Sequence, residues 1–276
     1  MAEWVSNPQS ANTKQKNKAT ENIVTGGTRE KVVDWVLGAL PIASLLGLWH
    51  LVAVFGDVPT YLLPAPLDVA ETFWEELVGG NIALHVQLSL SHYLLGLGAG
   101  IALGVPLGLL VGSVSLASKL LEPLVSLLRP IPPLAWIPFA ILVIGINTQA
   151  AAFIIGLGAF YINFYNTLAG VRSIDRKLVE AARTLGDHPL GIIWRVVVPS
   201  ALPHILTGIR ISIGQGWMTV VAAEMFGIRG LGQRLMDAAG LLAMEIVITY
   251  MIVIGVIHLG MDLGFRWIES YILRWR

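Results

Sequence analysis

Long apolar stretches with very few charged residues recur along this chain. The first three that are uninterrupted are Trp35–Phe55, Ser89–Gly112 and Gln149–Val171. A helix rises about 1.5 Å per residue, so about 20 residues cross a hydrocarbon core of roughly 30 Å. The composition agrees, because 55% of the 276 residues are hydrophobic and only 13% are charged, which is too apolar for an ordinary soluble domain. The sequence therefore predicts an all-α integral membrane protein.

Six transmembrane helices are expected within residues 31–276. The third is the least regular, because Lys119–Arg129 is polar at its ends and a proline-rich segment separates it from Phe139–Ile146, which completes the span. The six predicted spans are Trp35–Phe55, Ser89–Gly112, the span completed by Phe139–Ile146, Gln149–Val171, Ala201–Phe226 and Glu245–Phe265.

Two polar regions flank the first predicted span. Residues 1–30 are rich in Asn, Gln, Thr and Lys without apolar periodicity, which predicts a disordered N-terminal tail. The first apolar run begins too late for a cleaved signal peptide. Gly56–Asn81 contains three prolines followed by an acidic amphipathic run, Asp68–Val78, and this predicts an extracytoplasmic loop with an interfacial helix.

The distribution of lysine and arginine predicts the orientation. Cationic residues gather in the tail, at the end of the chain and in the loop around residues 173–199, whereas residues 56–88 contain none. By the positive-inside rule that loop is cytoplasmic, and an even number of spans puts both termini on the same side. Arg229 and Arg234, in the loop predicted before the sixth span, are exceptions to the rule.

Composition and motifs argue against several other classes. Zero net charge gives no reason to expect nucleic-acid binding, and the absence of cysteine removes disulfides, thiol catalysis and cysteine metal sites. The six histidines lack the paired spacing of a helical metal site, so no metal is expected. The chain has no GxxxxGK[ST] phosphate-binding loop, so we expect neither ATP hydrolysis nor a cofactor in this chain.

Residues 173–199 form the longest stretch of mixed polar character between two spans. Asp175 can cap a short helix, Arg176–Leu185, which has apolar residues on one face and charged residues on the other. Gly186 can end this helix in the left-handed conformation, and Asp187 with Pro189 marks the start of a second helix. The pattern predicts two short amphipathic helices that meet at a glycine.

This segment resembles the EAA loop of permease subunits of bacterial ABC importers. The resemblance rests on Glu180-Ala181-Ala182, three residues, Gly186, nine residues, and Val196-Val197-Val198-Pro199, with Val196 and Val198 where the family prefers Ile and Leu. In that family the loop is a cytoplasmic coupling helix that docks into a groove of the ATPase subunit; an ordinary interfacial helical hairpin is the alternative. The residues that the resemblance assigns to coupling are Glu180, Ala181, Ala182, Arg183, Thr184, Leu185, Gly186 and Asp187.

A second motif, Leu128-Arg129-Pro130-Ile131-Pro132-Pro133-Leu134-Ala135-Trp136-Ile137-Pro138, resembles a signature of the nitrate/sulfonate/taurine branch of these permeases. Leu63-Pro64-Ala65-Pro66 resembles another, weaker motif of the branch. Four prolines in nine residues prevent a regular helix, and a broken backbone at membrane depth must be covered by protein or face water. Arg129, Pro132, Pro133 and Trp136 are therefore candidates for a translocation path or gate, with a packing kink as the alternative.

The second predicted span carries a glycine at every fourth position from Gly96 to Gly112. These glycines form one bare ridge on a helix, which allows a neighbouring backbone to approach closely. We favour packing within one subunit over a dimer seam. His92, in the same span, occupies a position where many family members carry arginine, so the role of that arginine cannot be transferred.

Two ionisable residues are expected in the fifth span. Arg210 lies about 18 Å along the helix from Val198, near mid-membrane, and Glu224 lies near the outer end. A charge at that depth is costly unless it is paired or hydrated, so both residues are candidates for the translocation path. A cation beside the path would suit an anionic substrate, and a structural partner for Arg210 is an equal alternative.

The resemblance covers Leu63 to Arg276 and implies the membrane domain of a type I ABC importer in the bacterial inner membrane. It implies two copies of this chain, two ATPase subunits that bind ATP and Mg²⁺, and a periplasmic binding protein. Within the branch, a sulfonate such as taurine is the favoured substrate, with nitrate or bicarbonate as alternatives. A secondary transporter is the rival class, but it usually carries inverted repeats or intramembrane carboxylates for ion coupling.

Overall fold

The structure, a computed structural model, describes residues 37–38 and 40–272, and the predicted tail (residues 1–30) lies outside the described residues. The chain divides into two compact units, residues 1–67 and 68–276, which are described separately. In the first unit an apolar helix covers Leu40–Phe55. The indole Nε1 of Trp49 donates a 3.1 Å hydrogen bond to the carbonyl of Pro64. Trp35, where the first predicted span begins, is not among the described residues.

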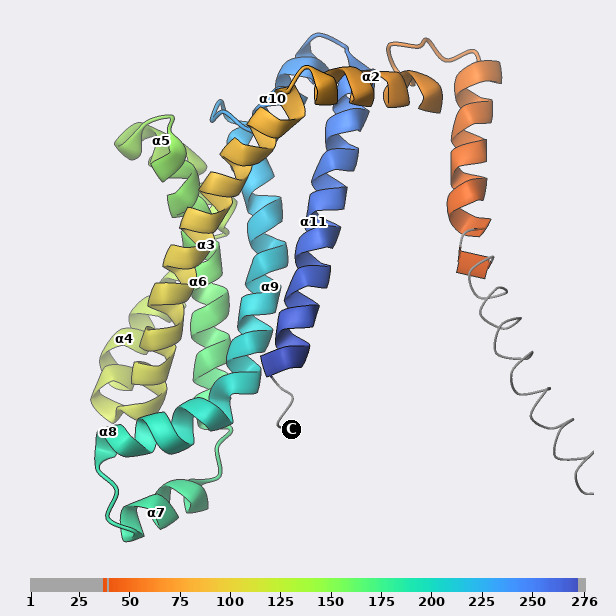
Figure 1. The fold of residues 1–276 in the computed structure, drawn as a ribbon. Helices are drawn as coiled ribbons and strands as arrows, with labels where there is room; N and C mark the ends of the chain where they lie inside the picture. Colours follow the sequence, from red (N-terminus) through yellow and green to blue (C-terminus); the bar gives the residue numbers. More distant parts are fainter. Residues whose placement is uncertain (1–36, 39, 273–276) are drawn as a thin grey trace, which may run out of the picture. The chain divides into compact units, whose positions relative to one another are not determined.

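Every regular element of the second unit, within its described residues, is helical (Figure 1). In chain order these are α2 (Pro66–Val78), α3 (Asn81–Ser113), α4 (Ser115–Leu128), the 3-10 helix η1 (Pro133–Trp136), α5 (Ile137–Ile144), α6 (Thr148–Arg172), α7 (Arg176–Thr184), α8 (Pro189–Ile192), the π-helical turn η2 (Ile193–Val197), α9 (Val198–Glu224), α10 (Leu231–Gly240) and α11 (Met244–Ile272).

Four of the described helical segments are long and apolar enough to cross a membrane: α3, α6, the continuous segment Pro189–Glu224 and α11. A fifth span is obtained if α4 and the η1–α5 segment, which bend by 81° at their junction, are counted as one. The prediction of a helical membrane domain is confirmed. The first predicted span, Trp35–Phe55, stays a prediction.

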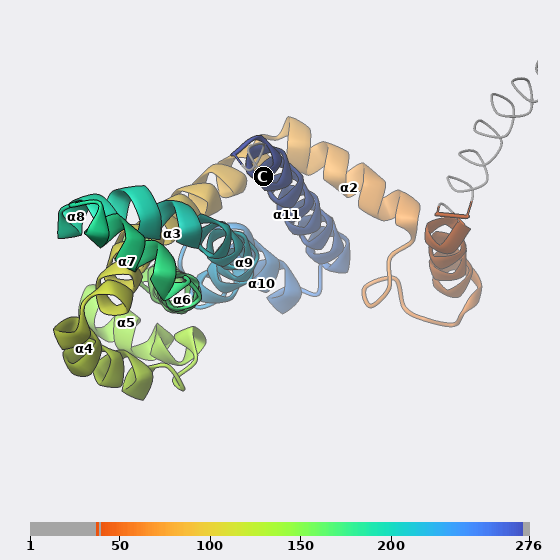
Figure 2. The same ribbon diagram turned by 90° about the horizontal axis from the view of Figure 1, so that it is seen from below.

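Helices α3, α6 and α9 form the centre of the second unit, and Figures 1 and 2 both show them side by side. The glycine ridge of α3 faces α6. A Cβ atom added at Gly104 would lie 2.7 Å from the carbonyl oxygen of Phe160, and one at Gly96 would lie 2.7 Å from that of Ala152. The ridge thus packs within one subunit, as predicted, because only glycine permits backbones to approach so closely.

Aromatic side chains fasten the neighbouring helices at the centre of the unit. Tyr93 of α3 and Trp217 of α9 meet edge to face with ring centroids 5.5 Å apart. The hydroxyl of Tyr93 donates to the carbonyl of Ile213 over 3.1 Å, and the indole Nε1 of Trp217 donates to that of Ile254 in α11 over 3.0 Å. Both rings are buried, so these bonds form away from competing water.

Two predicted irregular regions are more regular than expected. The loop before the last span contains α10, whose first two amides find side-chain acceptors in the core. The second helix of residues 173–199 does not end before the fifth span, because Pro189–Glu224 is continuous. Pro199 has no N–H to donate to the carbonyl of Arg195, and the backbone instead forms the π-helical turn η2, in which the amide of Val198 donates to the carbonyl of Ile193.

Candidate functional site

The segment at residues 173–199 contains the short helix α7 and the start of the continuous helical segment Pro189–Glu224, and these two meet at a glycine as predicted. The side chain of Asp175 accepts a 2.9 Å hydrogen bond from the amide of Lys177 and so caps α7. Gly186 follows α7 with φ +81°, a left-handed conformation that glycine adopts without strain. His188, rather than the predicted Asp187, is the N-cap residue of α8, and Pro189 is its first residue. Figure 1 shows α7 and α8 at one end of the unit and α10 at the opposite end.

The two short helices attach to the unit through a small apolar cluster. Ile192 and Val197 are buried with Val171 at the end of α6, and Val179 and Ala182 of α7 pack against this cluster. Arg172 at the end of α6 forms a bidentate ion pair with Glu122 of α4, with a shorter contact of 2.6 Å. The apolar cluster holds the segment against the end of α6, and the ion pair joins that end of α6 to α4.

Large apolar side chains of the same segment remain uncovered. Leu178 and Leu185 of the α7 region and Leu190 and Trp194 of the α8–η2 region are all exposed, with Leu185 reaching 87%. The predicted apolar face of the first helix is therefore divided, since Ala182 packs inward whereas Leu178 and Leu185 point away. We call these four exposed residues the apolar rim. An apolar surface of this kind, next to charged residues, is typical of a protein-binding surface.

The residues assigned to coupling surround this rim. Glu180, Ala181, Arg183, Thr184, Leu185 and Gly186 are exposed, whereas Ala182 and Asp187 are partly buried. Asp187 contacts Arg195 of η2 over 3.4 Å, so this ion pair lies within the second half of the segment, after Gly186. Glu180 and Arg183 line a cavity of about 580 Å³ beside the C-terminal ends of α3 and α6. The structure thus brings the predicted coupling residues together on one segment.

The proline-rich motif forms the break between α4 and α5. The guanidinium of Arg129 lies 4.3 Å from the ring centroid of Tyr165 in α6, a cation–π contact. Pro132 caps η1, and the ring of Pro133 lies against Gly158 of α6. Trp136 stacks edge to face on Phe139 and Phe153, and its indole nitrogen is buried without a hydrogen-bond partner. The motif therefore packs on α6.

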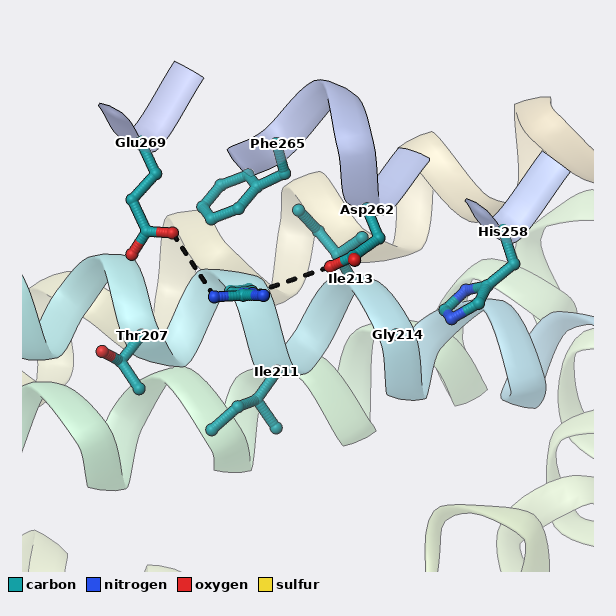
Figure 3. A pocket seen from close by; sticks show the side chains of 9 residues that line it. Thr207, Ile211, Ile213, Gly214, His258, Asp262, Phe265 and Glu269 are labelled. Carbon is teal, nitrogen blue, oxygen red and sulfur yellow. Dashed lines mark ion pairs between the residues drawn. The ribbon is translucent and has the colours of Figure 1, made fainter. Parts of the chain in front are cut away.

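Arg210 faces α11 across a cavity of about 420 Å³ (Figure 3). Its Nε lies 3.6 Å from Oδ1 of Asp262, and its Nη1 lies 3.6 Å from Oε2 of Glu269. Asp262 also accepts a 2.8 Å hydrogen bond from Arg266. Arg210 therefore has structural partners, which was one of the two alternatives for this residue in the sequence analysis. It also lines a cavity.

Glu224 is the centre of a buried polar cluster at the other end of α9. Its carboxylate is within 2.9 Å of Nδ1 of His92 and accepts a 2.8 Å hydrogen bond from Ser89 and a 2.9 Å bond from the amide of Gly232. Ser89 in turn accepts from the amide of Leu231 over 2.9 Å. The carboxylate thus satisfies the first amides of α10 and joins α3, α9 and α10.

A second polar cluster explains one exception to the charge rule. Arg234 of α10 contacts Glu76 of α2 over 2.6 Å, and Glu76 also accepts a 2.8 Å hydrogen bond from the hydroxyl of Tyr250. Burial raises the pKa of Glu76, whereas the hydrogen bonds from Arg234 and Tyr250 lower it. The hydrogen bonds outweigh burial, so the pKa of Glu76 is below its ordinary value. Arg234 is thus neutralised by an acidic partner on its own side.

The contacts place the predicted path residues in three different surroundings: the α4–η1 break against α6, the α9–α11 cavity, and the core between α3, α9 and α10. Arg210 and Glu224 share a helix but contact different neighbours. Sequence reasoning did not single out Ser89, Asp262 or Glu269, although charged residues within an apolar run are the signal that would have found the two acids. Within the described residues no group of three His, Asp or Glu could hold a metal ion.

Comparison with known proteins gives consistent matches. Residues 104–274 match the family described as "Binding-protein-dependent transport system inner membrane component". A putative ABC transporter permease protein of Methanocaldococcus jannaschii is 37% identical over 90% of this chain and 94% of its own length. The taurine transport system permease protein of Escherichia coli is 33% identical over 85% and 87%, and the bicarbonate transport system permease protein of Synechococcus elongatus is 34% identical over 85% and 89%.

A solved structure shows the same fold. A chain of the MetNI methionine ABC transporter, in an inward-facing conformation, superposes with a TM-score of 0.61 at 22% identity and covers 69% of this chain and 95% of that chain.

Proposed function

Because this chain belongs to the family of binding-protein-dependent transport system inner membrane components, as a permease of the ABC importer branch that includes sulfonate, taurine and bicarbonate systems, we propose that it forms the membrane path for a small anion and couples that path to a separate ATPase. Two copies of this chain, two ATPase subunits that bind ATP and Mg²⁺, and a periplasmic binding protein make up the proposed assembly in the inner membrane. Both termini lie in the cytoplasm.

The apolar rim is the observation that supports coupling through residues 173–199. Leu178, Leu185, Leu190 and Trp194 are exposed next to Glu180 and Arg183, and the second half of the segment continues without a break into α9. A partner protein that binds the apolar rim can therefore move the spanning helix α9 directly. ATP-driven closure of the two ATPase subunits would supply this movement, and the spanning helices would alternate between inward-open and outward-open arrangements.

A sulfonate such as taurine is the substrate that we favour, and nitrate or bicarbonate are the alternatives within the branch. The names of the relatives support this choice, since they include permeases for aliphatic sulfonates, taurine and bicarbonate. Arg210 adds a cation at a cavity between spanning helices. Uptake of labelled taurine, an alkanesulfonate, nitrate and bicarbonate by vesicles containing the complete assembly distinguishes these candidates.

The coupling assignment is tested by the ATPase activity of this chain co-purified with its ATPase subunit in lipid. Gly186→Pro should abolish coupling, because proline fixes φ near −65° whereas Gly186 has φ +81°. Glu180→Ala should weaken binding of the ATPase subunit or uncouple hydrolysis from transport. Glu75→Ala is the matched control, since Glu75 is an exposed carboxylate on α2, at the end of the unit away from the rim.

Wild-type rates in both Gly186→Pro and Glu180→Ala, or failure of the wild-type chain to bind an ATPase subunit, would contradict this function and favour a secondary transporter.

A further inference from the structure

Arg210 is held between two carboxylates without being locked to either. Both of its ion-pair distances, to Asp262 and to Glu269, are 3.6 Å. Three other arginine–carboxylate pairs of the unit are shorter, at 2.6 Å for Arg172 with Glu122 and for Arg234 with Glu76 and 2.7 Å for Arg266 with Asp262, while the exposed pair of Arg195 with Asp187 measures 3.4 Å. Distances of 2.7–2.9 Å are usual when a charged donor and acceptor are hydrogen-bonded. Arg210 is therefore paired electrostatically but retains freedom to move.

The two carboxylates lie at different distances from the point where α9 and α11 are fastened together. That point is the hydrogen bond from Trp217 to the carbonyl of Ile254. At about 1.5 Å per residue, Asp262 lies about 12 Å from Ile254 along α11, and Glu269 lies about 22 Å from it. If α11 rocks against α9 about this bond, Glu269 moves nearly twice as far as Asp262.

The space around Arg210 permits such a movement. The cavity between α9 and α11 measures about 420 Å³ and is lined by Arg210, and Figure 3 shows the carboxyl groups of Asp262 and Glu269 that also line it, each with a dashed line for its ion pair. Gly214, one turn from Arg210 towards the fastened end, has no side chain, and its backbone lies near the ring of His258. Thr207, one turn towards the other end, is small. Neither neighbour on α9 blocks the cavity.

The movement that would make α11 rock against α9 would reach the cavity through α9 itself. Because Pro189–Glu224 is continuous, a displacement of the α8–η2 region is transmitted to α9 and not absorbed by a loop. A charge within a spanning segment is costly unless it is paired. A rocking motion that separates Arg210 from Glu269 must therefore leave it with Asp262, which is closer to the fastened point.

We propose that Asp262 and Glu269 are positioning residues for transport: Asp262 keeps Arg210 paired throughout the cycle, and Glu269 pairs with Arg210 in one conformation and releases it in the other. This inference rests on the proposed function, because the ATPase supplies the movement. The exchange gives each conformation its own charge pairing between α9 and α11. Loss of the Glu269 contact removes the difference between the two conformations without removing the partner of Arg210.

Cysteine cross-linking can follow the movement, because the chain contains no native cysteine. The pair Thr207→Cys with Phe265→Cys reports on the cavity and leaves all three charged residues in place. The pair Gly214→Cys with His258→Cys is the control near the fastened end, where a Cβ at position 214 would lie 3.5 Å from the His258 ring. Both pairs are compared in the complex with its ATPase, without nucleotide and after trapping with ATP and vanadate.

The yield of the 207–265 cross-link should change several-fold between the two states, whereas that of the 214–258 cross-link should stay the same. An unchanged 207–265 yield in a complex that hydrolyses ATP overturns the proposal. A complex that fails to assemble or hydrolyse ATP instead overturns the proposed function, and the proposal with it. ATPase activity, measured on the same sample, separates these two failures.

Charge variants give a second, independent readout. Glu269→Gln should lower the number of substrate molecules imported per ATP hydrolysed and make the 207–265 yield similar in both states, while Glu269→Asp, which keeps the charge, should recover part of the difference. Glu245→Gln, at the opposite end of α11, is the matched control. A purely structural contact predicts a loss of assembled complex with an unchanged ratio of substrate to ATP, and that result would also overturn the proposal.

Discussion

Glycines of α3 show how single residues set the spacing of the central helices. Gly96, Gly100, Gly104 and Gly108 each bring α3 into contact with backbone atoms of α6, so that an added methyl group would collide with a carbonyl oxygen. Gly98, in the same helix, is exposed and has no atom within 4 Å of an added Cβ. The position of a glycine relative to α6, and not its presence in the helix, therefore decides its importance.

Gly104→Ala should destabilise the protein by about 1–3 kcal/mol, the usual cost of overpacking a tight contact. Gly98→Ala should be neutral or stabilising, because alanine is favoured over glycine by about 1 kcal/mol in a helix interior. Thermal unfolding in detergent, followed by loss of helical signal, measures both. Equal stability of the two variants would show that the ridge does not determine α3–α6 packing.

Buried polar residues act in a similar way at the α10 end of the unit. Glu224 satisfies the first amides of α10 together with Ser89, and a side chain at Gly230 would collide with its carboxylate. These residues explain why part of the loop between α9 and α11 forms a helix. Glu224 is fully buried, and through these contacts it helps to position α10. This is in addition to the predicted role of Glu224 in the translocation path.

Individual helices agree closely with the sequence-based predictions where local signals alone define them. The cap at Asp175, the stop at Gly186 and the amphipathic run Asp68–Val78 are local signals, and the structure has the cap, the stop and a helix over that run. Of the two misjudged elements, only α10 depends on distant partners. Helix α10 requires acceptors from α3 and α9, and the continuity of α8 with α9 requires the π-helical turn around Pro199.

The network of Glu76, Arg234 and Tyr250 links three elements, α2, α10 and α11, and should make stability depend on pH. Because the pKa of Glu76 in the folded protein is below its ordinary value of 4.5, the network contributes fully above about that pH and its contribution is lost as the pH falls through the lower folded value. Glu76→Gln should cost about 1–3 kcal/mol at neutral pH, since it removes a charge-assisted hydrogen bond from a buried site.

Thermal unfolding at neutral pH and below pH 4.5 tests this dependence. The difference between wild type and Glu76→Gln should narrow as the pH falls. Glu75→Gln, which changes an exposed neighbouring carboxylate, is the control and should match the wild type throughout. A difference that stays constant with pH would contradict the role of the Glu76 charge.

The second unit as a whole has two chemically different ends. The apolar rim and Arg172, Arg176 and Arg183 lie at the end formed by α7 and α8, whereas α10 and its neutralised Arg234 lie at the other (Figure 1). The positive-inside rule assigns the first end to the cytoplasm. Arg234 does not oppose this assignment, because its charge is paired with Glu76.

Labelling of single cysteines tests the orientation, since the native chain has none. Leu185→Cys and Leu241→Cys occupy exposed positions at opposite ends, at 87% and 78% exposure. A membrane-impermeant thiol reagent added outside intact spheroplasts should label Cys at position 241 and should label position 185 only after permeabilisation. The reverse pattern would place the coupling segment outside and contradict the proposed function.

The amino-acid sequence alone predicted a helical membrane protein and the two helices within residues 173–199. It also predicted the first residues of α6 and α11 to within one position. Apolar length, caps and glycine stops are local properties, so no partner is needed to recognise them. Motif spacing also indicated the family. The functional assignment of individual path residues did not follow, because a charge in an apolar run shows that a partner is required but not which one.

Only the tertiary structure shows which residues pair with these charged side chains. Arg210 meets Asp262 and Glu269, Glu224 meets His92 and Ser89, and Glu76 meets Arg234, across sequence separations that no local pattern encodes. Each pairing depends on which faces of two helices come together, and that depends on the whole core, above all on the glycine contact between α3 and α6. Burial then makes the pairings of Glu224 and Glu76 strong, because unpaired charges in an apolar interior are costly.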